Sequence, residues 1–153
     1  MVSNVLQRFA WVLIAITGLP FVIFGISALL FGLSSSDTPV GLPGGPDAVA
    51  SITGMPWDKV LAEDETAVTL LRGVSRVAGL AFLALGILVL TVASIPFRRG
   101  QRWAWLALWV VPAFMFGLLL HERNGDFVAM PVILLALSLA ALLLPSRTFF
   151  AER

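Results

Sequence analysis

Cysteine and tyrosine are absent from this sequence, and histidine occurs once, at His121. Without cysteine the chain forms no disulfide, binds no metal through thiolates, and has neither a thiol nucleophile nor a redox-active dithiol. With a single histidine, a haem cannot be held between two histidines of the same chain. These absences remove thiol and redox-dithiol chemistry before any motif is considered.

Charge is scarce as well. Only 12% of the 153 residues are charged and 59% are hydrophobic, with a mean hydropathy of +0.97. Soluble domains usually carry about 25% charged residues, so this composition predicts a surface that faces lipid. The length suits a single transmembrane domain over residues 1–153. The net charge is +1 and the basic residues are few and scattered, so we expect no nucleic-acid partner.

Four stretches are long and apolar enough to cross a bilayer core about 30 Å thick, which needs roughly 20 helical residues. They cover about residues 9–33, 67–95, 103–120 and 127–144. Period-2 alternation is missing, and unpaired backbone groups cannot be left in lipid, so the spans should be helices. The apolar run of the first span exceeds that of a signal peptide, so we expect it to be retained. The fold predicted is an all-α, polytopic four-helix membrane bundle.

The basic residues predict the orientation of these spans. The loop between spans two and three contains Arg98, Arg99 and Arg102 without an acid, whereas the long loop 34–66 contains six acids and only Lys59. By the positive-inside rule, both termini and the basic loop lie in the cytoplasm and loop 34–66 lies outside. A binding site for nucleic acid or inositol lipid at the three arginines is the alternative to this purely topological interpretation. The predicted location is the inner or plasma membrane of a cell.

Small residues predict how the helices pack. Helices in lipid associate by close backbone approach at such residues. The heptad series of small residues is Gly18, Gly25 and Gly32 in the first span, and Gly79, Gly86 and Ala93 in the second. We therefore expect spans one and two to pair through a left-handed seam. Pro20 and Pro112 lie inside spans one and three and should kink them.

The loop 34–66 should contain two short helices. Pro46 at a first helical position and Gly54 after the end predict one helix over residues 46–53. Pro56 precedes a second over residues 57–62. A tryptophan near each boundary, such as Trp57 outside and Trp103 inside, fits an aromatic belt.

Arg72 and Arg76 are the residues most indicative of a site. They lie at the outer end of span two, against the positive-inside bias. At 100° per residue they share a stripe with Gly79 and Gly86, so we expect both guanidinium groups to point into the bundle. Ionisable residues so placed need partners and are functional candidates.

Partners for these arginines are available on the same side of the membrane. Acids at positions 63–65 precede them, and the third span ends outside with His121 and Glu122. The predicted site residues are therefore Arg72, Arg76, His121 and Glu122, grouped in one outer vestibule. Three interpretations stay open: a structural salt-bridge lattice, a site for an anionic head group with arginine forks as donors, and proton transfer by His121 or Glu122 on a lipid-like substrate.

Other classes of function are less well supported by the residues. No carboxylate, histidine or asparagine lies near the middle of a span, which argues against a secondary transporter and a monomeric ion pore. No phosphate loop, nucleophile elbow or metal-ligand spacing is present, so we expect no cofactor, no metal and no assigned catalytic residue. A component of an oligomeric transporter or channel stays open as an alternative.

The run Arg98-Arg99-Gly100-Gln101-Arg102-Trp103-Ala104-Trp105 is a basic turn that leads into an aromatic helix start. Together with the acidic outer loop and a second helix that opens on arginine, this layout resembles small bacterial four-helix membrane proteins of uncharacterised families, loosely the DoxX-like ones. The resemblance implies a four-helix bundle and no particular activity. The expected function is a non-enzymatic membrane protein. It would be an accessory subunit or a binder of a lipid or amphiphile head group, with membrane lipids and another membrane protein or a second copy as partners.

Overall fold

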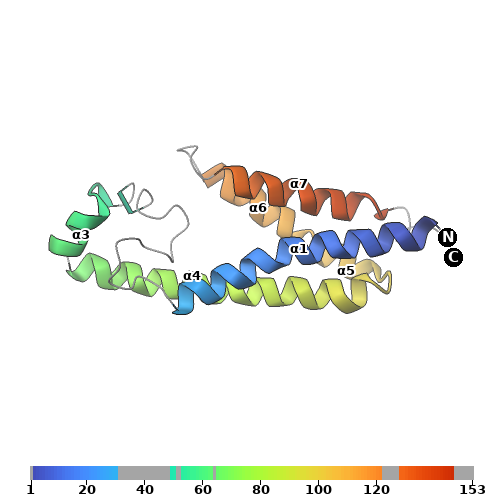
Figure 1. Cartoon of the computed structure of the whole chain (residues 1–153), viewed down its shortest axis with the longest axis horizontal. Helices are drawn as coiled ribbons and strands as arrows, with labels where there is room; N and C mark the ends of the chain where they lie inside the picture. Colours follow the sequence, from blue (N-terminus) through green and yellow to red (C-terminus); the bar gives the residue numbers. More distant parts are fainter. Residues whose placement is uncertain (1, 31–48, 51–52, 64, 122–127, 147–153) are drawn as a thin grey trace. The chain divides into compact units, whose positions relative to one another are not determined.

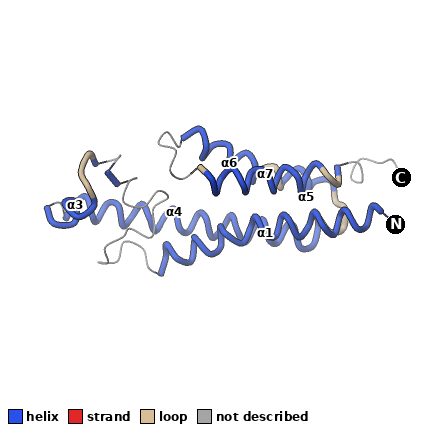
Figure 2. Tube along the Cα trace, turned by 45° about the horizontal axis from the view of Figure 1, so that its top comes forward, coloured by secondary structure: helices blue, strands red, loops and turns tan. Residues whose placement is uncertain are grey.

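The computed structural model describes residues 2–30, 49–50, 53–63, 65–121 and 128–146. Within these ranges every regular element is helical and no residue forms a strand (Figures 1 and 2). The all-α prediction is therefore confirmed for this part of the chain. Three described segments are long and apolar enough to cross a membrane, namely Phe9–Leu30, Glu65–Phe97 and Arg102–Leu120, and Ala129–Leu143 is a shorter apolar helix.

The chain divides into two units, each described by itself. Unit 1 consists of Met1–Pro20 and Gly86–Arg153, and unit 2 consists of Phe21–Leu85. The long helices α1 (Val2–Leu30) and α4 (Glu65–Val92) contribute residues to both units. Helix α1 stays helical at Pro20, where a kink is predicted. Gly32, the last small residue of the predicted seam, lies outside the described residues.

Glycines bring α1 and α4 into close contact in both units. In unit 2, a Cβ atom on Gly25 would lie 2.6 Å from the backbone nitrogen of Leu83, and one on Gly79 would lie 2.7 Å from the Cβ of Ala28. As the residue number rises along α1, the number of its neighbour on α4 falls, so these segments are antiparallel. In unit 1, a Cβ on Gly18 would lie 3.0 Å from a methyl group of Val89. Side chains larger than hydrogen would hold the helices apart at these points.

Helix α4 is longer than one crossing requires. It begins at Glu65, two residues before the predicted start, and continues into the π-helix η1 (Ala93–Phe97) as one apolar segment of 33 residues. At 1.5 Å per residue this segment is about 50 Å long, whereas a bilayer core is about 30 Å thick. The π-turn contains Pro96, which has no N–H to donate to the preceding turn, so the regular hydrogen-bond ladder is interrupted there.

A tight turn joins η1 to α5 (Arg102–Ala107). Gly100 has a φ of +71°, in the left-handed region that favours glycine. The Gly100 N–H donates to the Phe97 carbonyl, and the Gln101 N–H donates to the Pro96 carbonyl, both at 3.0 Å. This pair of bonds is the Schellman motif, which satisfies the last carbonyls of a helix and lets the chain reverse. The turn is therefore held by backbone geometry.

The third predicted span consists of two helices rather than one kinked helix. Helix α5 ends at Ala107, residues 108–109 form a turn, and α6 runs from Val110 to His121. Pro112 lacks the N–H that would otherwise donate to Leu108, and the Val111 N–H donates to that carbonyl instead, at 3.1 Å. In place of the predicted kink, the helix is interrupted for a short stretch that begins four residues upstream of Pro112. The missing N–H of Pro112 explains this position, because that N–H would have donated to the carbonyl of Leu108.

Helices α6 and α7 (Ala129–Leu143) lie side by side (Figure 1). The indole N–H of Trp105 in α5 donates to the carbonyl of Leu142 at 2.8 Å, near the end of α7. Trp105 also meets Trp109 edge to face, with ring centroids 5.5 Å apart. These contacts join the start of the third apolar segment to the end of α7. Helix α7 has 15 residues and is buried on one side at Pro131, Leu134, Ser138, Ala141 and Leu142.

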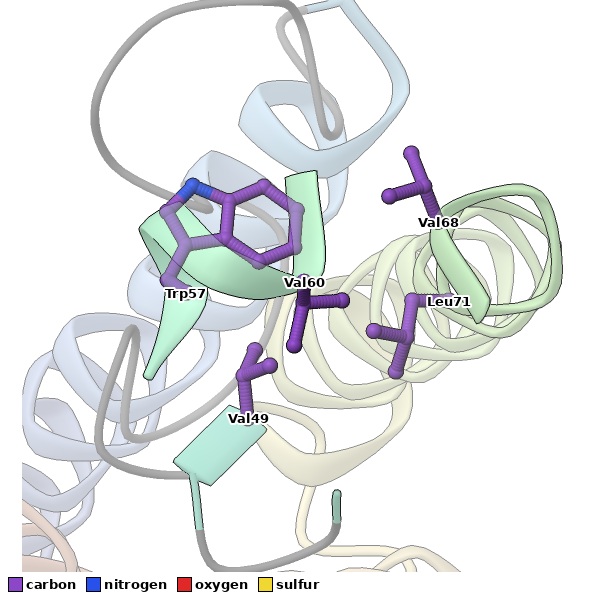
Figure 3. Close-up of a cluster of buried hydrophobic side chains, with 5 residues drawn as sticks. All are labelled: Val49, Trp57, Val60, Val68 and Leu71. Carbon is purple, nitrogen blue, oxygen red and sulfur yellow. The ribbon is translucent and has the colours of Figure 1, made fainter. Parts of the chain in front are cut away.

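The short helix α3 (Trp57–Glu63) packs against the first turns of α4 in unit 2. Figure 3 shows the side chains of this hydrophobic cluster converging from three segments, and they are Val49, Trp57, Val60, Val68 and Leu71. Upstream, Gly54 has a φ of +71° and its N–H donates to the Ala50 carbonyl at 2.9 Å, which ends the preceding helical turn. The bounds of α3 agree with the predicted helix 57–62 to within one residue.

Candidate functional site

Arg72 and Arg76 lie on α4 between the hydrophobic cluster of Figure 3 and the close approach at Gly79. Both side chains are exposed in unit 2. The buried face of this part of α4 consists of Val68, Leu71, Ser75 and Gly79. Within unit 2 the two arginines therefore lie beside the buried face of α4 and not on it, and the prediction that both guanidinium groups point into a four-helix bundle stays a prediction.

The offset of the two arginines from the buried face is one of angle. At 100° per residue, Arg72 lies about 60° and Arg76 about 100° around the helix from Ser75, on the same side of it. The predicted stripe contains Gly79, Gly86 and the two arginines. Its two glycines are buried, whereas the arginines lie at the edge of the buried face. Long arginine side chains at such an edge extend outward along the helix surface. The two guanidinium groups thus share one exposed side of α4.

The length of the uncharged stretch that follows these arginines indicates how deep they would lie in a bilayer. From Val77 to Phe97 the chain has no charged side chain, and at 1.5 Å per residue this stretch is about 30 Å long, like a bilayer core. Arg76 is the first charged residue beyond it, and Arg72 lies one turn, about 6 Å, further out. In a bilayer matched to this stretch, both would lie at the level of the lipid head groups.

Ser75 is buried beside the two arginines. Its exposed fraction is 0%, and its hydroxyl has no hydrogen-bond partner in the part of the chain that the structure describes. Two other buried hydroxyls, those of Thr17 and Ser138, donate to carbonyls of their own helices at 2.8 and 2.9 Å. An unpaired buried hydroxyl costs about 1–3 kcal/mol. The sequence interpretation overlooked Ser75, although its spacing of seven residues from Val68 marks it as part of the buried face.

The other predicted site residues are described only in part. His121 is the last residue of α6 and belongs to unit 1, whereas Arg72 and Arg76 belong to unit 2. Glu122 lies outside the described residues, and so does Asp64 among the acids expected to pair with the arginines. Glu65 is exposed at the start of α4. The grouping of Arg72, Arg76, His121 and Glu122 in one vestibule therefore stays a prediction.

Metal ligation finds no support among the described residues, where no three carboxylate or imidazole side chains come together. The chemistry that the described site offers is that of two arginine forks on one helical face. Arginine presents planar N–H donors that match the oxygens of a phosphate or carboxylate in pairs. The arrangement is suited to binding an anion.

No protein-family model matches this chain, and no curated protein or solved structure is detectably similar to it.

Proposed function

We propose that this chain is a multi-pass protein of the cell membrane that crosses the bilayer four times. The three long apolar segments support this proposal, together with α7 and its apolar flanks as the fourth crossing. Both termini and the turn at residues 98–102 would lie in the cytoplasm, since basic residues concentrate there, and α3 would lie outside.

The activity that the site supports best is binding of an anionic head group of a lipid or other amphiphile at the outer end of α4. Arg72 and Arg76 would bind it with their guanidinium groups. The observation that carries this proposal is their placement. Both are exposed on one side of α4, one turn apart, directly beyond an uncharged stretch about 30 Å long. An amphiphile whose tail lies along the exposed apolar side of α4 would present its head group at that level.

The exposed apolar side chains of α4 supply the second half of such a site. Leu80 and Val77, both more than half exposed in unit 2, lie about 40° and 100° around the helix from Arg76, whereas the exposed Leu70 and Val74 lie on the opposite side of α4. A charged head alone would bind weakly at a solvated surface, because exposed ion pairs contribute only about 0–1 kcal/mol. Together with an apolar tail along α4, two arginine forks add both affinity and orientation. The predicted ligand is therefore an amphiphile rather than a small soluble anion.

The test compares the amphiphiles that copurify with the parental protein and with Arg72→Gln/Arg76→Gln, using native mass spectrometry. We expect the parental protein to retain an anionic amphiphile and the double variant to lose it by about tenfold or more, since hydrogen bonds to charged groups contribute roughly 1.5–3 kcal/mol each. The control Arg72→Lys/Arg76→Lys keeps both charges but removes the planar forks. It should retain part of the ligand. Equal retention by the parental protein and the glutamine variant would rule out the proposed function.

A further inference from the structure

The indole of Trp57 is a hydrogen-bond donor without a partner inside unit 2. This tryptophan opens α3 and is only 4% exposed, yet no group in the part of the chain that the structure describes accepts a hydrogen bond from its buried indole N–H. The neighbouring side chains of the hydrophobic cluster, Val49, Val60, Val68 and Leu71, are apolar and offer no acceptor. A buried donor left unsatisfied costs about 1–3 kcal/mol. The cost of this donor suggests a role for Trp57 beyond packing.

The nitrogen of this indole lies on the same side of the cluster as Arg72. In Figure 3 the nitrogen is on the edge of the Trp57 ring that points away from the other four labelled side chains, on the upper side of the cluster. Figure 3 also shows Val68 above Leu71 on α4. Around this helix Val68 lies about 60° from Leu71, and Arg72 lies about 40° further in the same sense. Arg72 thus follows Val68 toward the side on which the indole N–H lies.

The direction of side chains along α4 brings the arginines closer to α3. Every Cα–Cβ bond of an α-helix tilts toward the N-terminal end, so a long side chain covers the turn that precedes it. The turn before Arg72 contains Val68, a member of the hydrophobic cluster, and the turn before Arg76 contains Arg72. A head group bound by the two arginines would therefore lie at the α3 end of the site, next to the cluster.

The chemistry of these groups specifies the partner that they share. An indole N–H and a guanidinium group only donate hydrogen bonds, so the tryptophan and the arginines cannot satisfy one another. Anionic oxygens only accept. A phosphate monoester presents three strong acceptor oxygens around one phosphorus atom, whereas a carboxylate presents two in one plane. Two arginine forks on α4 and an indole from a second helix therefore suit a phosphate better than a carboxylate.

We propose that Trp57 donates its indole N–H to a phosphate head group bound at Arg72 and Arg76, and that α3 closes over this group. The inference rests on the proposed function and narrows its ligand to an amphiphile with a phosphate head. Since the indole N–H is buried, α3 has to shift to admit the ligand. One small cluster attaches α3 to α4, and elements held by few buried contacts open at a low cost in free energy.

The test follows the indole N–H directly, by magnetic resonance of the whole chain in maltoside micelles with dodecyl phosphate as the probe. The chain has five tryptophans, so nitrogen-15 in the indole rings gives five N–H signals, and Trp57→Phe identifies the signal of residue 57. We expect dodecyl phosphate to move the Trp57 proton signal downfield, because a hydrogen bond to an anion is short and strong. Dodecanoate, a carboxylate with a chain of the same length, should move it less. The signal of Trp103, whose N–H already donates to Gln101, is the internal control. An unmoved Trp57 signal would overturn the inference without relying on a variant that folds.

Matched variants separate hydrogen bonding by Trp57 from its packing. Trp57→Phe keeps an aromatic ring in the cluster but removes the donor, and it should weaken binding of dodecyl phosphate by about tenfold, the effect of one lost hydrogen bond to a charged group. Val60→Ala truncates another buried side chain of α3 and keeps the indole, so it should weaken binding less. Equal losses in the two variants would reduce Trp57 to a packing role and overturn the inference. Failure of the proposed function is seen separately, as unchanged binding of dodecyl phosphate by Arg72→Gln/Arg76→Gln.

Discussion

Gly25 and Gly73 show how differently two glycines of the same unit are used. At Gly25 the nearest atoms to an added Cβ are the backbone nitrogen and the Cβ of Leu83, at 2.6 and 2.7 Å, and the backbone cannot move aside cheaply. At Gly73 an added Cβ would meet nothing within 4 Å. Both are helical, so both are less favourable than alanine by about 0.8–1.0 kcal/mol in intrinsic propensity. Only at Gly25 does packing oppose that preference.

We therefore predict opposite effects of alanine at these two positions. Gly25→Ala should lower the free energy of unfolding by about 1–3 kcal/mol, as overpacked substitutions do. Gly73→Ala should leave it unchanged or raise it by up to about 1 kcal/mol. Thermal unfolding in detergent measures both. A Gly25→Ala protein as stable as its Gly73→Ala counterpart would show that α1 and α4 are not in contact at this point.

At the scale of elements, the start of α4 has two roles. Its first turns supply Val68 and Leu71 to the cluster with α3, and the next turns expose Arg72 and Arg76. Trp57 is the largest side chain of that cluster and is only 4% exposed. The cluster is small, so loss of one large side chain should detach the whole of α3 from α4 rather than leave a cavity in an intact cluster.

We predict that Trp57→Ala makes α3 accessible to a protease specific for lysine. The chain contains one lysine, Lys59, which lies within α3, so cleavage reports on this helix alone. Removing a buried tryptophan costs about 3–5 kcal/mol, which should raise the cleavage rate severalfold or more. Met55→Ala, which truncates a side chain packed at the edge of the cluster, is the matched control and should have a smaller effect. An unchanged rate in Trp57→Ala would mean that the cluster does not hold α3.

At the scale of the whole molecule, the unequal distribution of charge is the main feature. Described basic residues concentrate in the turn at 98–102, whereas the acids of the sequence concentrate in residues 37–65. A membrane protein with this distribution should be oriented by it, with the basic turn in the cytoplasm. The proposed site at Arg72 and Arg76 would then face the outer leaflet of the bilayer.

Cysteine labelling tests this orientation. We predict that a membrane-impermeant thiol reagent applied to intact cells labels Ser35→Cys and leaves Gln101→Cys unlabelled until the membrane is permeabilised. The cysteine-free parental protein is the background control. The reverse pattern would invert the orientation and move the proposed site at Arg72 and Arg76 to the inner leaflet.

Much of the fold could be predicted from the sequence, because the properties involved are local. A run of apolar residues makes a helix in lipid whatever its neighbours are, and proline or glycine interrupts it through its own backbone geometry. The short helix after Pro56 and the break near Pro112 follow from such local properties. The left-handed turn at Gly100 arises in the same way.

What the sequence by itself determined is therefore the helical character, the apolar segments and the positions of the charges. The tertiary structure decided which face of each helix is buried, because that depends on where a neighbouring helix approaches. At α4 the approach of α1 to Gly79 turned the buried face toward Ser75 and left Arg72 and Arg76 exposed. Sequence periodicity cannot fix the position of the buried face to better than about 60–100° around the helix, because several overlapping stripes of small and apolar residues satisfy the same repeat. Within unit 2 this places both arginines on the exposed side of α4, beside the buried face.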